Sequence, residues 1–170
     1  MALTSGVRAL ALAPQSGLLY RELEPADIAG VTALLAVIPN LYPDGERWLR
    51  RRLTDALAGR ARCTVATSHD ALAGVAIETP KANRRIKLST YVIDSGHQRL
   101  GIGVDLMAHL RERWVEEAAG EVYVTVADGV MPTVEATFRK GGFTRTALEQ
   151  NRYGLGRHEH VMTWLPPTTR

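Results

Sequence analysis

Residues 86–119 read IKLSTYVIDSGHQRLGIGVDLMAHLRERWVEEAA, and the rest of the chain is organised around them. Ile86 to Ile93 form a β-like run, which is followed by a polar turn and two closely spaced glycines, Gly101 and Gly103. Beyond the glycines, apolar residues at three- and four-residue steps predict a helix. Its expected apolar face carries Val104, Met107, Leu110, Trp114, Val115 and Ala118. A glycine turn before a helix presents unpaired N–H groups at the positive end of the helix dipole, which predicts a phosphate or diphosphate site.

Two common phosphate-binding motifs do not fit this turn. The loop that binds nucleoside triphosphates requires Lys-Ser or Lys-Thr after its last glycine, and Val104-Asp105 stands there instead. The dinucleotide fingerprint requires a third glycine, whose position is occupied by Leu106. A tight turn that only starts a core helix is the alternative without a ligand.

A third pattern, Gln/Arg-x-x-Gly-x-Gly/Ala between a strand and a helix, is filled by Gln98, Gly101 and Gly103. Here the chain resembles the GNAT family of N-acetyltransferases, which use acetyl-coenzyme A. The resemblance implies that Gln98, Arg99, Leu100, Gly101, Ile102 and Gly103 bind the coenzyme diphosphate. It also implies that the backbone of Tyr91, Val92 and Ile93 pairs with the pantetheine arm.

Secondary-structure signals along the chain predict the order β-α-α-β-β-β-α-β-α-β-β. Expected strands lie at residues 18–23, 62–67, 72–78, 86–93, 121–126, 143–148 and 159–165. This order is similar to the GNAT fold, and the resemblance covers about residues 18–165. It implies an α/β (α+β) fold: a mixed, mostly antiparallel seven-stranded sheet with about four helices, which opens between strands 4 and 5. The ending Phe138-Arg139-Lys140-Gly141-Gly142-Phe143 also resembles a family signature.

Composition is that of an ordinary globular protein, with 170 residues, 45% hydrophobic and 23% charged residues. We expect one acyltransferase domain over residues 17–166, preceded by a flexible extension at residues 1–16. The net charge of +3 favours an acidic ligand such as coenzyme A but does not indicate nucleic-acid binding. No apolar run is long enough to span a membrane. The single cysteine, Cys63, fits a cytoplasmic protein without disulfides.

The acid of the expected reaction is not where the family places it. In many GNAT members a tyrosine in the last helix protonates the departing thiolate, and its position corresponds here to Phe138. Phenylalanine cannot ionise, but it can pack on the pantetheine arm. Tyr91 or Tyr123 is therefore considered as a substitute acid, beside departure of the thiolate unaided or through water.

The general base has three candidates, because the attacking amine must lose a proton. Glu78, at the end of the third strand, comes first, followed by Asp94 and His97. Each has a structural alternative: Glu78 can be a solvated strand-end charge, and His97 a loop residue near the coenzyme phosphates. We predict no metal site, because His158 and His160 lack a third ligand.

Three functions follow from these residues. The first is direct, base-assisted transfer of an acetyl group from acetyl-coenzyme A to a small amine, a peptide N-terminus or a lysine. The second is a silent coenzyme A-binding regulatory module, which the absent tyrosine at Phe138 keeps open. The third, ranked lowest, is a toxin-like transferase that acts on aminoacyl-tRNA. No membrane partner is expected, and a homodimer is left open.

Overall fold

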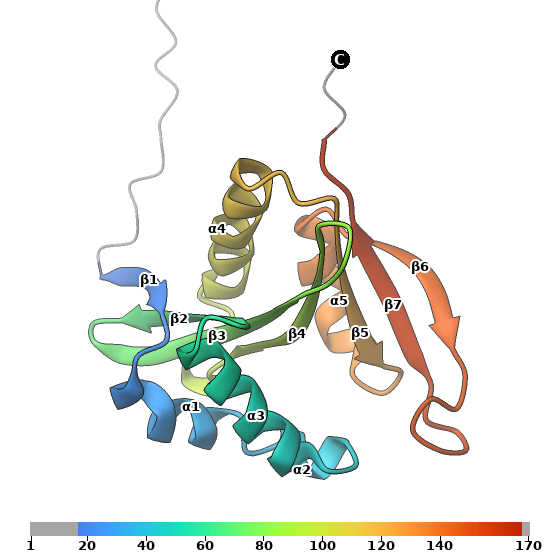
Figure 1. The fold of residues 1–170 in the computed structure, drawn as a ribbon, viewed down its shortest axis with the longest axis horizontal. Coiled ribbons are helices and arrows are strands. Elements are labelled where there is room, and N and C mark those ends of the chain that lie inside the picture. Colours follow the sequence, from blue (N-terminus) through green and yellow to red (C-terminus); the bar gives the residue numbers. More distant parts are fainter. Residues whose placement is uncertain (1–16, 168–170) are drawn as a thin grey trace, which may run out of the picture.

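The computed structural model describes residues 17–167. Its strands are β1 (Leu18–Glu22), β2 (Arg62–Ser68), β3 (Ala71–Pro80), β4 (Arg85–Ile93), β5 (Glu121–Ala127), β6 (Thr144–Glu149) and β7 (Glu159–Trp164). They form one sheet in the order β1-β2-β3-β4-β5-β7-β6, antiparallel except between β4 and β5 (Figure 1). This sheet confirms the predicted fold class. The extension predicted for residues 1–16 lies outside the described residues and stays a prediction.

The described part of the chain has five α-helices, where the sequence suggested about four. They are α1 (Ile28–Leu34), α2 (Ile38–Leu41), α3 (Gly45–Leu57), α4 (Ile102–Glu116) and α5 (Met131–Lys140). The extra helix arises because apolar residues at helical spacing from Ile28 to Ile38 predict one helix, whereas α1 ends at Leu34 and α2 begins at Ile38 with Pro39 in its first turn. Proline is tolerated there because the missing N–H would have no intrahelical acceptor. Among residues 17–167, no helix has the length and apolar character needed to cross a membrane.

Two hydrophobic cores lie on opposite faces of the sheet. The core under α4 and α5 surrounds Trp114, whose ring lies 5.3 Å from that of Trp164 and 5.9 Å from that of Phe143. The second core lies under α1–α3, where Val31 and Leu53 pack against residues of β2 and β3. Strand residues that alternate along the chain therefore point to different helical layers.

The buried face of α4 differs in part from the prediction. Met107, Leu110 and Trp114 are buried as expected, but Val104 and Val115 are 42% and 51% exposed. At 3.6 residues per turn, both valines lie to the side of the face that the buried residues form. Their apolar character alone therefore predicted burial wrongly. Ala118 lies beyond the end of α4 and is exposed.

The sheet opens between β4 and β5, as predicted. Their ladder joins Arg85–Lys87 to Glu121–Tyr123 and stops there, while β3 continues to pair with β4 and β7 with β5. A register shift between β3 and β4 leaves Ser89 as an extra residue in β4. Alternation is reversed at this bulge, so Leu88 faces the α4 core, and so do Tyr91 and Ile93 after it.

Candidate active site

The glycine turn ends in an uncapped helix N-terminus. Gly101 is the N-cap of α4 with φ of 82°, in the left-handed region that glycine adopts without strain. It carries no side chain that could cap the helix, and the first intrahelical bond runs from the Asp105 amide to the Gly101 carbonyl at 3.0 Å. The amides from Ile102 to Val104 precede that bond and point out of the helix end. A side chain at Gly101 would enter open space, so an anion has room in front of these donors.

The turn before the helix is held by its own polar side chains. Asp94 accepts hydrogen bonds from the Gly96 amide at 3.0 Å and from His97 Nδ1 at 2.8 Å. The bond from His97 lowers the pKa of Asp94. Gln98 Nε2 donates to the Ile93 carbonyl at 3.1 Å, which ties the turn to the end of β4. Asp94 and His97, considered as bases from the sequence, are thus engaged in shaping the turn.

Tyr91 connects β4 to the first turn of α4. Its hydroxyl donates to the Gly103 carbonyl, and its ring lies 5.7 Å from that of Phe138. Burial raises the pKa of Tyr91, so the phenol stays neutral. Phe138 is 3% exposed and packs on Phe143 as well, 5.4 Å away. The structure therefore brings the loop, the end of β4 and Phe138 together, and their roles in binding the coenzyme stay a prediction.

The edge of β4 that faces the opening is unpaired where the sequence places the pantetheine arm. Tyr91, Val92 and Ile93 pair with β3 on one side. In the described part of the chain, β5 forms no ladder with these residues on the other side. Extended backbone at an unpaired strand edge can add a strand-like ligand, and here the Ile93 carbonyl already accepts a hydrogen bond from Gln98 Nε2. A ligand that binds the helix end can thus continue along this edge.

Comparison with known proteins identifies the family. Residues 41–163 match the model described as an acetyltransferase (GNAT) domain. The chain belongs to the GNAT acetyltransferase family. A search of curated protein sequences found no match.

Solved GNAT structures share the fold at low sequence identity. An aminoglycoside 6′-N-acetyltransferase complexed with coenzyme A has a TM-score of 0.75 at 15% identity, covering 89% of this chain and 99% of its own. Spermidine N-acetyltransferase from Vibrio cholerae, with coenzyme A and spermine, has a TM-score of 0.71 at 17% identity, covering 88% and 96%. The ribosomal-protein-S18-alanine N-acetyltransferase from Escherichia coli has 0.73 at 17%, covering 90% and 96%. Acetyl-coenzyme A is the cofactor of this family.

Glu78, the first candidate base of this GNAT chain, lies buried on the α4 face of β3. It is 2% exposed, accepts a hydrogen bond from Trp114 Nε1 at 2.5 Å and forms an ion pair with Arg113. Burial raises the pKa of Glu78, and the charge of Arg113 acts in the opposite direction. Both carboxylate oxygens are occupied by donors, which is the arrangement of a structural ion pair.

Tyr123 lies on the opposite face, where the ladder between β4 and β5 ends. It is the register partner of Lys87, and the guanidinium of Arg85 lies 4.9 Å from its ring centroid. Val122 and Val124 face the α4 core, so alternation points Tyr123 toward the α3 side. Tyr91 and Tyr123, the two candidate acids, therefore lie on opposite faces of the sheet: Tyr91 on the α4 face and Tyr123 on the α3 face.

Glu159 is a buried carboxylate that sequence reasoning missed. It begins β7, is 2% exposed, and its Oε2 has no hydrogen-bond partner in the described part of the chain. Burial raises its pKa, and the nearby charges of Arg152 and Lys87 oppose that shift. The sequence offered no signal, because a glutamate at the start of a strand is usually solvated.

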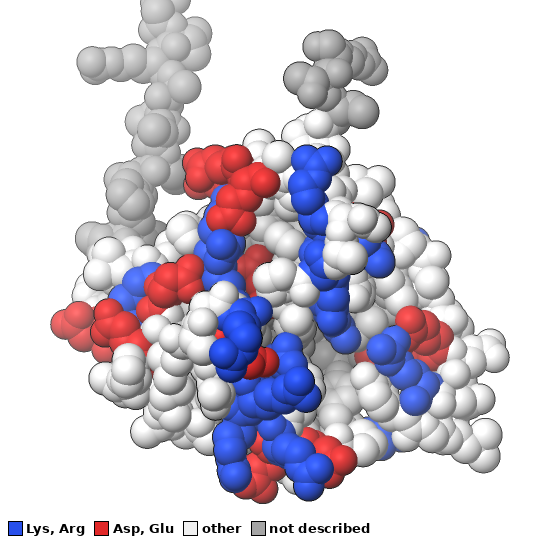
Figure 2. All heavy atoms as spheres, in the orientation of Figure 1, with Lys and Arg blue, Asp and Glu red and all other residues white. Residues whose placement is uncertain are grey.

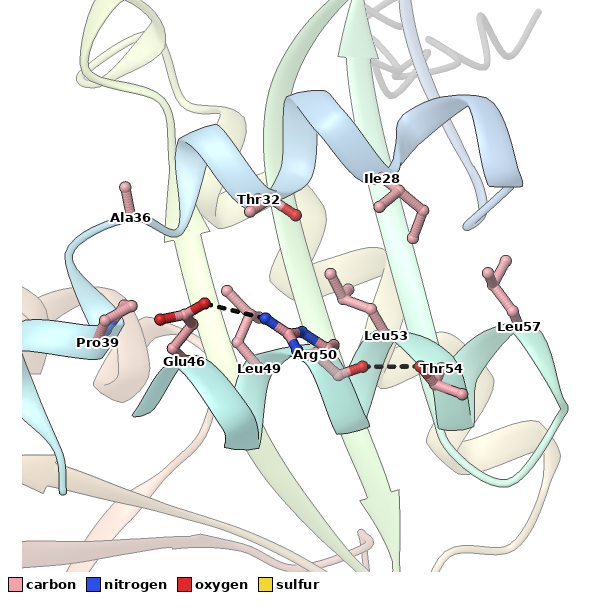
Figure 3. A pocket seen from close by; sticks show the side chains of 10 residues that line it. All are labelled: Ile28, Thr32, Ala36, Pro39, Glu46, Leu49, Arg50, Leu53, Thr54 and Leu57. Atoms are coloured by element: carbon pink, nitrogen blue, oxygen red, sulfur yellow. Dashed lines mark hydrogen bonds and ion pairs between the residues drawn. The ribbon is translucent and has the colours of Figure 1, made fainter. Parts of the chain in front are cut away.

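A groove of about 500 Å³ lies between α1 and α3 (Figure 3). Figure 3 shows Ile28 and Thr32 from one helix facing Leu53 and Leu57 from the other, with Arg50 paired to Glu46. None of the predicted site residues lines it. The groove therefore has no part in the coenzyme site described above.

Proposed function

We propose that this protein transfers the acetyl group of acetyl-coenzyme A directly to an amine, with general-base assistance, through a domain that spans residues 17–166. The supporting observation is the continuity between the uncapped end of α4 and the unpaired edge of β4. One extended ligand with a diphosphate can use both surfaces at once. Its acyl end then reaches the place where β4 and β5 separate.

Each part of this path has a task in the proposal. The amides of Ile102 to Val104 bind the diphosphate, and the backbone of Tyr91 to Ile93 binds the pantetheine arm. Phe138 packs beside that arm. When bound, the coenzyme supplies an already activated thioester, so the protein has to orient the amine and remove its proton.

The thermal stability of the protein should reveal the coenzyme site. Acetyl-coenzyme A at 100 times its Kd should add about 2.7 kcal/mol to the unfolding free energy, because it binds the folded state. For a domain of this size that corresponds to an increase of about 5–10 °C in Tm. Differential scanning fluorimetry measures the shift, and release of the coenzyme thiol with a panel of amines measures turnover. No shift at saturation would contradict the proposal, whereas a shift without thiol release would favour a silent coenzyme A-binding module.

Tyr123 is the better-placed substitute acid. The hydroxyl of Tyr91 is bound to Gly103, whereas no side-chain hydrogen bond involves Tyr123 within residues 17–167. We expect Tyr123→Phe to lower kcat about 100-fold and to leave coenzyme affinity unchanged, because a general acid acts in the transition state. Tyr20→Phe, on the distant edge strand β1, is the matched control. An unchanged kcat in Tyr123→Phe would mean that the thiolate leaves unaided or through water.

A further inference from the structure

Within residues 17–167, a carboxylate and an ammonium group that form no ion pair lie on the same face of the open sheet. Met162 and Trp164 of β7 face the α4 core, so alternation points Glu159 to the α3 face. Ile86 and Leu88 of β4 face the α4 core in the same way, which points Lys87 to the α3 face. Glu159 is paired in register with Ala127 at the end of β5, and Lys87 lies where β4 and β5 separate. The two groups thus belong to one side of the opening.

The cations around Glu159 are engaged elsewhere. Among the described residues no Lys, Arg or His forms an ion pair with this carboxylate, although four of them act on its charge: Arg152, Lys87, Arg157 and His160. Three of the four have other partners, namely Glu149 for Arg152, the Leu41 carbonyl for Arg157 and Asp128 for His160. A buried carboxylate without a donor is costly, so a ligand donor is the natural complement.

Of these four cations, Lys87 is the one without a side-chain partner among the described residues. It is partly buried and forms no ion pair within the described part of the chain. Burial lowers its pKa, and the charges of Arg152, Lys81 and Arg52 lower it further, while Glu159 raises it. Figure 2 shows Lys and Arg side chains gathered along the middle of this face, over α3 and the start of β4. An anionic ligand group would relieve the repulsion among these cations.

Two segments far apart in the sequence meet near Glu159. Arg157, in the loop between β6 and β7, donates to the Leu41 carbonyl at the end of α2. Next to that contact, the rings of Tyr42 and Tyr153 meet edge to face at 5.1 Å. Burial and the charge of Glu159 raise the pKa of Tyr42 to about 12, which places its hydroxyl within the field of the carboxylate. Among the described residues, two tyrosine rings, a carboxylate without an ion-pair partner and an excess of positive charge thus lie near one another.

We propose that the acceptor is a primary amine that also carries an acid group, a carboxylate or a phosphate, with Glu159 binding its ammonium and Lys87 its acid group. This inference rests on the proposed acetyltransferase function and names its substrate class. A polyamine would place a second ammonium among the cations of this face, and a simple amine would leave Lys87 unpaired. Both should therefore be poorer acceptors.

Matched pairs of amines test the inference. Thiol release is measured with β-alanine against propylamine for the carboxylate, and with O-phosphoethanolamine against ethanolamine for the phosphate. We expect at least one acid-bearing amine to exceed its neutral partner about tenfold or more in kcat/KM, through KM, because charged hydrogen bonds are strong. The two pairs distinguish carboxylate from phosphate. Neutral amines used as well as both acid-bearing ones would overturn the inference.

Two substitutions assign the ends of the acceptor. Lys87→Gln should reduce the preference for the acid-bearing amine to about twofold or less, with little change for the neutral partner. Glu159→Gln should raise KM for both members of a pair about tenfold or more, because it removes the charge that binds ammonium. Lys140→Gln and Glu116→Gln, both exposed and neither among the charges that act on Lys87 or Glu159, are the matched controls. An unchanged preference in Lys87→Gln or an unchanged KM in Glu159→Gln would overturn the assignment.

Failure of this inference is distinguishable from failure of the proposed function. The proposed function fails if acetyl-coenzyme A gives no thermal shift, whatever the amine. Calorimetric titration of β-alanine and O-phosphoethanolamine into the protein then tests the acceptor site by itself. Binding that is weakened in Lys87→Gln and Glu159→Gln would support the site, and the absence of binding by both probes would overturn it.

Discussion

A Gly101→Asp variant is expected to lose coenzyme A affinity by at least about 100-fold, or about 2.7 kcal/mol, while it keeps its fold. Asp tolerates the left-handed conformation of this position better than most residues. A Cβ there meets no atom within 4 Å, so the carboxylate would extend into the space in front of the amides of Ile102 and Gly103. It would compete for these donors and repel the diphosphate. Isothermal titration calorimetry with coenzyme A measures the loss.

Gly59→Asp is the matched control for this substitution. Gly59 follows α3, has a φ of 73° and, like Gly101, has open space where a Cβ would be. The two variants carry the same charge and a similar backbone strain, so their melting temperatures should agree within about 4 °C. Only Gly101→Asp should lose affinity. Equal binding by both variants would mean that the diphosphate binds somewhere other than the end of α4.

Glu78→Ala should lower the unfolding free energy by about 3–5 kcal/mol, because it breaks a buried ion pair by removing one partner. The side chain of Arg113 is 16% exposed, and the indole N–H of Trp114 lies inside the α4 core. Both donors would lose their acceptor while remaining shielded from water. Urea unfolding at neutral pH, with and without the substitution, measures the change.

Glu78→Gln separates a structural role from a catalytic one. The amide has the same size and keeps one oxygen acceptor for Trp114 or Arg113, so the loss of stability should be smaller than in Glu78→Ala. The control is Glu116→Ala, at an exposed position of α4, the helix that carries Arg113 and Trp114. It should change the unfolding free energy by less than about 0.5 kcal/mol. Near-native stability of Glu78→Gln with kcat reduced by orders of magnitude would restore Glu78 as the base.

Much of the fold could be predicted because its boundaries are marked by local sequence. The last helix, α5, is an example: the sequence marks both of its ends, since Pro132 lies in its first turn and Gly141-Gly142 follow it. Strand ends were within a few residues throughout. The break between α1 and α2 and the exposure of Val104 were not predicted, because both depend on how each helix packs against the sheet.

The candidate site was predictable where it is contiguous in sequence. The glycine turn and the helix that follows it are neighbours along the chain, and their geometry depends on local backbone preferences. Glu78 is a candidate base from its place at the end of the third strand, and the sequence does not show its partners, Arg113 and Trp114, because they lie 35 and 36 residues away. Glu159 had no signal at all, because a glutamate at the start of a strand is usually solvated and its burial is visible only in the folded chain.

The sequence by itself determined the order of the helices and strands and the uncapped N-terminus of α4 at Gly101. Through the GNAT signature, it also indicated the family. These features depend on residues next to one another, whose conformations are limited by backbone sterics and hydrogen bonding. The tertiary structure alone decided which charged groups are paired. It gave Glu78 two donors and left Glu159 Oε2 without one in the described part of the chain, because burial and charge pairing arise only when distant strands and helices meet.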